Sequence, residues 1–253
     1  MRSDHGMKEH RMTRSLSARS AIASLGDRYI RRRCQQDFDS QRFTRTNERP
    51  IEYAYVFQQL NALQPRTVLD VGSGVSALPS LLSTCGFVVT ATDNVRDYWP
   101  PGMLNRHWHT VDDDIRASKL PGPFDAVLCV STLEHIREHD AAMRQMLRLM
   151  RPGGHLILTI PYHETTYHPN VYESPEAAYG ADLPYPAQSF SRAELDGWLA
   201  SEPTYSAKLV NQEYWQCFTG DLWTFGELVR PPRRAAGPQD RHQLTCLTIQ
   251  RGA

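Results

Sequence analysis

Apolar and polar positions form two patterns along the middle of the chain. Short apolar runs are typical of strands, and apolar residues three and four positions apart are typical of helices. The apolar runs predict strands at residues 67–71, 87–92, 107–111, 124–130 and 155–160. Helical spacing predicts helices at residues 51–63, 76–85 and 140–150. Strands and helices that alternate in this way are typical of a parallel sheet with right-handed crossovers.

The pattern loosens after the fifth strand. Residues 162–190 are rich in Pro, Tyr, His and Glu and show no period. We expect a lid or a substrate-side loop there, because the aromatic content argues against disorder. Ser191 and Glu194 have the spacing of a capping box and open a further helix. Two closing strands are predicted at residues 208–214 and 244–249.

Charge is distributed unevenly, although the 253 residues carry no net formal charge. Residues 1–49 hold eleven arginines and one lysine against six acidic residues, so the rest of the chain is acidic by the same amount. We therefore divide the chain into a basic N-terminal extension at 1–49 and an α/β domain at 50–253. Within the domain we expect a cofactor-binding half at 64–161, the substrate-side loop at 162–190, and a closing helix with strands at 191–253.

The basic extension suits a solvated arm or a surface that packs on a partner, and association with a second copy of the chain is one such role. We expect no nucleic-acid partner, since no recognisable RNA-binding module accompanies the arginines. No run of about 18 apolar residues and no signal-peptide pattern is present, so we expect no membrane partner. Five scattered cysteines without a Cys-x-x-Cys pair predict a reducing, cytoplasmic setting and no metal site.

A glycine turn joins the first strand of the domain to the next helix. The strand ends in Asp70 and is followed by Gly72, Ser73 and Gly74. Glycine lacks Cβ, so the backbone can turn sharply there and approach a ligand closely. Strand, glycine turn and helix in this order build an adenosine-binding crevice at the carboxyl edge of a parallel sheet. Asp93 follows at about the 20-residue distance at which an acid binds ribose hydroxyls, which fits a nicotinamide dinucleotide as well as other adenosine ligands.

Five segments in order carry a more specific signal: residues 68–74, 92–94, 113–115, 124–136 and 149–161. Together they closely resemble the class I S-adenosylmethionine-dependent methyltransferases. The resemblance implies S-adenosyl-L-methionine as the cofactor. It also implies a Rossmann-like α/β fold, with helices on both faces of a seven-stranded, mostly parallel sheet whose last strand is antiparallel. Ser76 stands where many members carry a third glycine.

The resemblance also implies roles for residues at the strand ends. Asp70 would balance the ammonium group of the methionine portion, directly or through water, and the turn at 72–74 would face the same portion. Asp93, followed by Asn94, would hold the ribose hydroxyls. For each acid the alternative is a helix cap or a solvated turn.

Two further strand ends complete the expected cofactor site. By the same resemblance, Asp114 would accept a hydrogen bond from the adenine amino group while Ile115 packs on the ring, with Asp113 as the near alternative. Ser131 and Thr132 follow the fourth predicted strand and would line the ligand opposite the glycine turn.

Transfer of a methyl group from a sulfonium is an in-line displacement, so positioning supplies much of the acceleration. A general base helps only when the acceptor carries a proton. His135 lies just past the fourth strand, where many similar enzymes carry a Glu-His pair, and His163 and His168 lie in the substrate-side loop. We take these three as candidate bases, with structural roles as the alternative for each.

Aromatic residues around the expected cleft suit a planar or sugar-like acceptor. They are Tyr98, Trp99, Tyr162, Tyr167, Tyr172, Trp215 and Trp223. We therefore expect O-methylation of a small metabolite or saccharide, with N- or C-methylation left open. Two alternatives come from other classes: an NAD(P)-dependent oxidoreductase, and a non-catalytic ligand-binding or scaffold protein with the methyltransferase fold.

Overall fold

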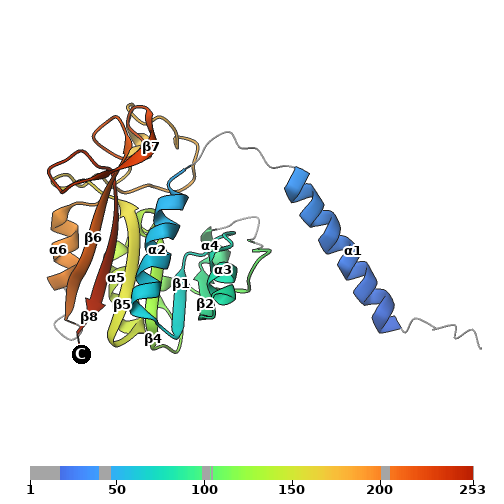
Figure 1. Ribbon diagram of the computed structural model, residues 1–253. Helices are drawn as coiled ribbons and strands as arrows, with labels where there is room; N and C mark the ends of the chain where they lie inside the picture. The colour runs from blue at the N-terminus through green and yellow to red at the C-terminus, as the bar shows by residue number, and fades with distance from the viewer. Residues whose placement is uncertain (1–17, 40–46, 99–102, 104, 201–205, 253) are drawn as a thin grey trace, which may run out of the picture. The chain divides into compact units, whose positions relative to one another are not determined.

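The computed structural model describes residues 18–39, 47–98, 103, 105–200 and 206–252 (Figure 1). The chain divides into two compact units, Met1–Thr46 and Asn47–Ala253. In the first unit, α1 (Ala18–Asp39) is a helix of 22 residues, so the basic extension is helical where it is described. Its association with a second copy stays a prediction. None of the described helices is long and apolar enough to cross a membrane.

The second unit is built on one mixed sheet of eight strands in the order β3-β2-β1-β4-β5-β8-β6-β7. The strands are β1 (Thr67–Val71), β2 (Val88–Asp93), β3 (Thr110–Asp112), β4 (Phe124–Val130), β5 (Met150–Pro161), β6 (Ala207–Phe218), β7 (Leu228–Ala235) and β8 (Leu244–Arg251). Strands β1 to β5 pair in parallel, and β8 lies antiparallel between β5 and β6. The expected Rossmann-like order with an antiparallel last strand is therefore present.

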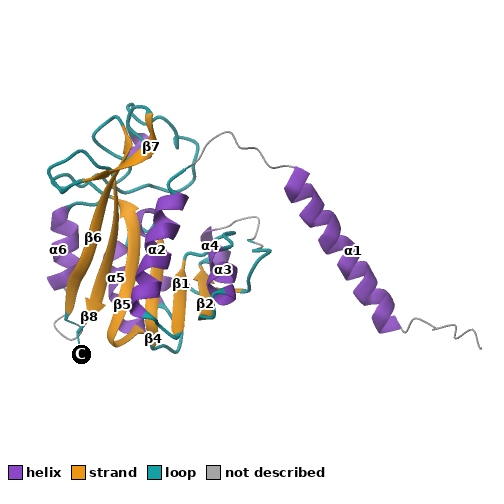
Figure 2. Cartoon of the chain, in the orientation of Figure 1, coloured by secondary structure: helices purple, strands orange, loops and turns teal. Residues whose placement is uncertain are grey.

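Helices cover both faces of this sheet (Figure 2). The α-helices of the unit are α2 (Arg49–Leu63), α3 (Leu78–Thr84), α4 (Val95–Tyr98), α5 (His139–Leu149) and α6 (Arg192–Ala200), and short 3-10 turns lie at η1 (Ile115–Ala117), η2 (Leu133–His135) and η3 (Val171–Glu173). Side chains of α2 and α3 pack on one face, as Leu60 and Leu82 do with Leu128 of β4. Side chains of α5 and α6 pack on the other face, where Met146 and Leu195 join a second core.

Strand β7 is an eighth strand beyond the seven expected. It pairs with β6 at the edge of the sheet, with Tyr214 opposite Ala235 and Phe218 opposite Leu228. The sequence Leu-Val-Arg-Pro-Pro-Arg-Arg-Ala has no apolar alternation, and two prolines argue against a central strand. An edge strand tolerates proline because one side of its backbone needs no partner, which explains why the pattern concealed this strand.

Two local predictions concern the ends of helices, namely the end of α5 and the start of α6. Helix α5 ends at Leu149, one residue before its predicted end, and β5 begins at Met150, five residues before its predicted start. The pairing of β5 with β4 jumps from Met150 to His155, so the Pro-Gly-Gly stretch is skipped in the ladder. Ser191 and Glu194 form the predicted capping box: the Ser191 N–H and hydroxyl both donate to Glu194 Oε2, at 2.9 and 2.6 Å. The box positions α6 directly after the substrate-side loop.

Candidate functional site

A cavity of about 630 Å³ opens at the carboxyl ends of β1, β2 and β4. Its lining includes all the residues expected to contact the cofactor: Asp70, Gly72, Ser73, Gly74, Asp93, Asn94, Asp113, Asp114, Ile115, Ser131 and Thr132. The carboxyl ends of parallel strands meet at one edge of a sheet, and ligands bind there at the point where the strand order reverses. Here that point lies between β1 and β4.

The glycine turn brings bare backbone to the cavity wall. Gly72 has φ +73° and Gly74 has φ +50°, a region that side-chain-bearing residues adopt at a cost. The Gly72 and Ser73 N–H groups donate to Thr92 O of β2, at 2.8 and 3.2 Å. Thr132 donates from Oγ1 to Gly72 O at 3.3 Å. The turn is thus held from the strands on both sides.

Asp70 presents an unsatisfied carboxylate at the base of this turn. Its side chain is buried, and Oδ2 has no hydrogen-bond partner within the described part of the chain. Burial raises the pKa of Asp70 to about 7, and the nearby charge of Asp93 adds to the rise. A buried carboxylate without a partner is costly, so this group suits a cationic ligand that would pair with it.

Asp93 ends β2 beside the turn. The Gly74 N–H donates to Asp93 Oδ2 at 2.8 Å, which holds the carboxylate against the cavity wall. Asn94 follows it in the lining. An acid at this position is placed to accept hydrogen bonds from ribose hydroxyls.

The two adjacent acids after β3 differ in their partners. Asp114 caps η1 by accepting from Arg116 N–H at 2.9 Å, and the Arg116 guanidinium donates to both Asp114 oxygens, to Oδ1 at 3.0 Å and to Oδ2 at 2.7 Å. These hydrogen bonds lower the pKa of Asp114. Asp113 accepts from Lys119 N–H through Oδ1 at 2.9 Å, while its Oδ2 is buried and has no partner among the described groups. Asp113 therefore has the greater capacity to accept from a ligand.

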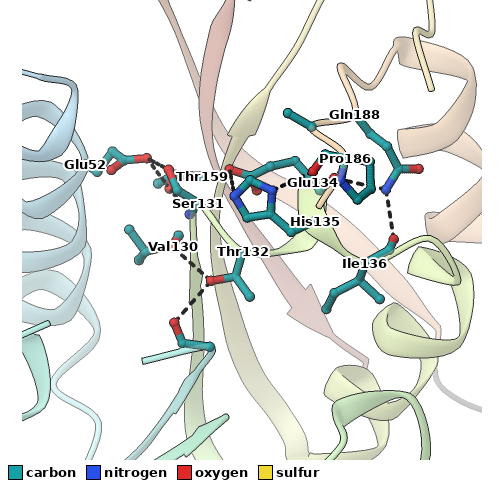
Figure 3. Close-up of polar contacts among 12 residues, drawn as sticks. Glu52, Val130, Ser131, Thr132, Glu134, His135, Ile136, Thr159, Pro186 and Gln188 are labelled. Carbon is teal, nitrogen blue, oxygen red and sulfur yellow. Dashed lines mark hydrogen bonds and ion pairs between the residues drawn. The ribbon is translucent and has the colours of Figure 1, made fainter. Parts of the chain in front are cut away.

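His135 is the candidate base that lines the cavity. Its Nδ1 lies 2.7 Å from Pro186 O, and since a carbonyl only accepts, Nδ1 carries the proton and Nε2 keeps its lone pair. Burial lowers the pKa of His135, which favours the neutral ring. Glu134 lies on the Nε2 side of the ring, with Oε1 3.9 Å from His135 Nε2, and burial raises the pKa of Glu134 to about 8 (Figure 3).

The structure places His163 and His168 outside this lining. His163 Nδ1 accepts from the Thr166 N–H at 3.1 Å, and His168 Nδ1 accepts from the Asn170 N–H at 3.3 Å. Both rings thus bond to the backbone of their own loop. Part of the substrate-side loop does reach the cavity, through Pro184, Tyr185 and Pro186.

The five described aromatic residues among those expected around the cleft do not line the cavity either. Tyr162 and Trp223 are buried in the core. Trp99 and the side chain of Tyr98 lie outside the described residues. The aromatic lining comes instead from Tyr53 of α2 and Tyr185.

Arg49 lines the cavity too, and the strand-end pattern did not predict it, just as it did not predict Tyr53 and Tyr185. Arg49 lies in the first turn of α2 and lines the cavity together with Tyr53, one turn further along. Its charge acts on both Asp70 and His135. The available signal was an arginine immediately before an amphipathic helix that leads into the first strand.

A mostly parallel sheet with a polar crevice at its topological switch point defines a Rossmann-like nucleotide-binding domain. Residues 31–201 match the sequence model of the family described as "Methyltransferase domain". The chain belongs to this methyltransferase family. Family membership argues against the oxidoreductase alternative.

Named relatives are similar over part of the chain. One is the ubiquinone biosynthesis O-methyltransferase of Xanthomonas oryzae pv. oryzae, 34% identical over 117 residues, which are 44% of this chain and 48% of that protein. Another is the protein of the same name in Yersinia pestis, 25% identical over 185 residues, covering 65% of this chain and 72% of that one. The chain thus aligns with about half the length of the first relative.

Among solved structures, the chain is similar to the 1,6-didemethyltoxoflavin-N1-methyltransferase of Burkholderia thailandensis, which was crystallised with bound S-adenosylhomocysteine. The TM-score is 0.52 at 15% identity, over 99% of this chain and 94% of that one. This similarity supports the fold.

Proposed function

We propose that this chain is an S-adenosyl-L-methionine-dependent methyltransferase that methylates a hydroxyl group of a small molecule. One observation carries the proposal: the carboxylate of Asp70, whose buried Oδ2 has no hydrogen-bond partner among the described residues, and the guanidinium of Arg49 lie in the wall of one cavity, beside the glycine turn. Two opposite charges in one wall complement the ammonium and carboxylate groups of an amino acid. In this proposal Asp70 binds the ammonium group of the methionine portion and Arg49 binds its carboxylate.

The adenosine portion would lie along the ends of β2 and β3. Asp93 would accept from the ribose hydroxyls, and Asn94 lies beside it in the lining. We assign the adenine amino group to Asp113, since its Oδ2 has no partner among the described groups while Asp114 is engaged by Arg116. Ile115 is buried at the same wall and supplies an apolar surface for the ring.

When bound, the sulfonium supplies an activated methyl group. The chain would then hold an acceptor hydroxyl in line with the methyl carbon, so that the oxygen–carbon bond forms as the carbon–sulfur bond breaks. His135 Nε2 carries the lone pair that would take the hydroxyl proton, and Pro186 O holds the other ring nitrogen in its protonated form. The lowered pKa of His135 favours the neutral ring, which is the form that a base requires.

A small acceptor fits the remaining lining. Tyr53, Tyr185, Pro184 and Pro186 offer flat and apolar surfaces near His135. Such surfaces suit a planar ring or the face of a sugar. Relatives named as O-methyltransferases add support for a hydroxyl acceptor. We therefore propose a small metabolite or saccharide, with transfer to nitrogen or carbon as outcomes of the test below.

Calorimetry tests the cofactor first. We expect S-adenosylmethionine and S-adenosylhomocysteine to bind the full chain and NAD not to bind. Failure of the first two to bind a folded protein would overturn the proposal, and binding of NAD alone would favour the oxidoreductase. Asp93→Ala should weaken the binding of S-adenosylhomocysteine by about 1–3 kcal/mol, because the hydrogen bonds to the ribose hydroxyls are lost.

A second experiment identifies the acceptor. Metabolite extracts are incubated with cofactor that carries an isotope-labelled methyl group, and labelled products are located by mass spectrometry. Carbon NMR of the product then distinguishes a methyl group on oxygen from one on nitrogen or carbon. Cofactor binding without any labelled product from a broad extract would favour the non-catalytic alternative.

A further inference from the structure

Glu52 is a fully buried carboxylate in the first turns of α2, and it does not line the cavity. Taking a charged group out of water costs several kcal/mol unless good partners replace the water. Well-packed apolar residues usually serve as well or better at such a position. The partners of Glu52 therefore indicate what this carboxylate does.

Those partners come from three parts of the chain, and Figure 3 shows the contacts of Glu52 with Ser131 and Thr159. Ser131, just past β4, and Thr159 of β5 donate their hydroxyls to Glu52 Oε1, at 2.5 and 2.8 Å. Arg49, three residues earlier on α2, donates from Nη1 to Glu52 Oε2 at 2.8 Å. One carboxylate thus ties the start of α2 to the ends of two strands.

The contact with Arg49 fixes a residue of the cavity wall. A guanidinium is planar and carries five donors in a rigid fork, so a bond to one nitrogen orients the whole group. Arg49 has 39% of its side chain exposed, whereas Glu52 has none exposed. Glu52 thus lies behind the cavity wall and makes hydrogen bonds to two residues of that wall, Arg49 and Ser131.

The contact with Ser131 fixes the opposite wall. Ser131 has φ +43°, a left-handed conformation that costs free energy for a residue with a side chain. Its N–H donates to Thr159 O at 3.1 Å and its hydroxyl to Glu52, so surrounding contacts maintain the strained backbone. The same turn places Ser131 and Thr132 in the cavity lining.

We propose that Glu52 is a positioning residue that orients Arg49, and the turn at Ser131, to receive the carboxylate end of the amino-acid portion of the cofactor. This inference rests on the proposed function. It follows that loss of Glu52 weakens the binding of ligands that carry the methionine carboxylate and leaves the binding of ligands that lack it unchanged. A purely structural role would weaken both kinds of ligand alike.

The test compares two probes on the full chain by calorimetry: S-adenosylhomocysteine, and 5′-methylthioadenosine, which lacks the amino-acid portion. In Glu52→Gln, the amide oxygen still accepts from Ser131 and Thr159, but the amide nitrogen replaces the acceptor that Arg49 uses. We expect the dissociation constant of S-adenosylhomocysteine to rise about tenfold or more. That of 5′-methylthioadenosine should stay within about twofold of the wild-type value.

Glu48→Gln is the matched control. Glu48 precedes Arg49 and acts on its charge, but no hydrogen bond joins the two side chains. The control removes the same charge without changing the orientation of Arg49, so it should keep the wild-type ratio of the two dissociation constants. In an Arg49→Gln background, Glu52→Gln should produce no further change in that ratio, because the residue it orients is gone.

The outcomes separate this inference from the proposed function. If wild-type protein fails to bind S-adenosylhomocysteine, the proposed function is wrong and the inference falls with it. Suppose instead that wild type binds both probes. If Glu52→Gln then raises both dissociation constants equally, or changes neither, only the role of Glu52 is overturned. Should Glu52→Gln fail to fold, Glu52→Asp replaces it, because it keeps the charge but is one methylene shorter. The same selective loss of S-adenosylhomocysteine affinity is expected. An equal loss of affinity for both probes overturns the role of Glu52.

Discussion

Thr132 occupies the space into which a side chain on Gly72 would extend: a Cβ on Gly72 would lie 2.1 Å from Thr132 Cγ2. Thr132 cannot readily move aside, because its single hydroxyl proton is shared between Gly72 O and Val130 O, which lie 3.3 and 3.1 Å from Oγ1. The turn after β1 and the turn after β4 are therefore in direct contact. Since both turns line the cavity, a change at their contact affects the fold and the site together.

Gly72→Ala tests this relationship. The new methyl group would overlap Thr132, and φ +73° adds backbone strain. We expect a loss of about 2–4 kcal/mol in the free energy of unfolding, measured by urea denaturation, and a loss of S-adenosylhomocysteine binding. Gly86→Ala is the control: Gly86 has φ +96° but open space around its Cβ position, so the strain alone should cost about 1–2 kcal/mol and leave binding intact. Equal losses in the two variants would show that the contact with Thr132 does not matter.

Asp70 should couple ligand binding to proton release. Its pKa of about 7 means that half of the free protein carries a protonated Asp70 at that pH. An ammonium group beside it favours the ionised form, so binding near pH 7 expels a proton and affinity rises as pH increases through 7. Calorimetry in buffers of different ionisation enthalpy measures this proton release. A binding enthalpy that is the same in every buffer would contradict it.

The same group should reduce the stability of the free protein. The folded pKa of Asp70 lies above its unfolded value of 3.8, so the folded state holds an extra proton between about pH 4 and pH 7, and stability falls as pH rises through that window. Asn stays neutral throughout. Asp70→Asn should therefore raise the free energy of unfolding by about 1–4 kcal/mol at pH 8, and by little at pH 4, while abolishing cofactor binding. A variant less stable than wild type at pH 8 would contradict this assignment.

The cofactor side of the site could be predicted from the sequence because parallel topology brings strand ends together. Asp70 and Asp93 lie at the carboxyl ends of β1 and β2, and Ser131 follows β4, so locating the strands was enough to place all three in one lining. Burial depth and side-chain pairing leave no such signal. The pattern could not show that Arg116 engages Asp114, and so could not choose between Asp113 and Asp114.

The acceptor side was harder to predict because it depends on how irregular segments fold back. His163 and His168 lie in the expected loop, yet only its 184–186 stretch reaches the cavity. Arg49 belongs to a helix that precedes the first strand, and only tertiary packing brings it to the crevice. Strand β7 escaped prediction for a different reason, since an edge strand needs neither apolar alternation nor the absence of proline.

A base-modified ligand can show whether Asp113 or Asp114 accepts the hydrogen bond from the adenine amino group. We expect wild type to prefer S-adenosylhomocysteine over S-inosylhomocysteine, whose base lacks the amino group. Asp113→Ala should reduce that preference by about tenfold, because a charged acceptor of the amino group is lost. Asp114→Ala should weaken both ligands to a similar extent, since it releases Arg116 and the cap of η1. The opposite result would assign the adenine amino group to Asp114.

His135 should affect catalysis far more than cofactor binding. With the acceptor found in the labelling screen, His135→Gln should lower kcat by about 10²–10⁴-fold, while the dissociation constant of S-adenosylhomocysteine stays within about twofold. The glutamine amide can still donate to Pro186 O, so the loop contact persists while the basic nitrogen is lost. His163→Gln, whose ring lies outside the cavity lining, serves as the control and should keep wild-type kcat.

The pH dependence gives an independent check on this role. Burial lowers the pKa of His135 from its ordinary value, so the wild-type kcat should fall in acidic solution, where the ring takes up a proton. The kcat/KM for the cofactor should fall earlier, near pH 7, because Asp70 must be ionised to bind the ammonium group. If His135→Gln retains both the wild-type kcat and the acidic fall, the proton goes to another group and His135 serves only to hold the loop at Pro186.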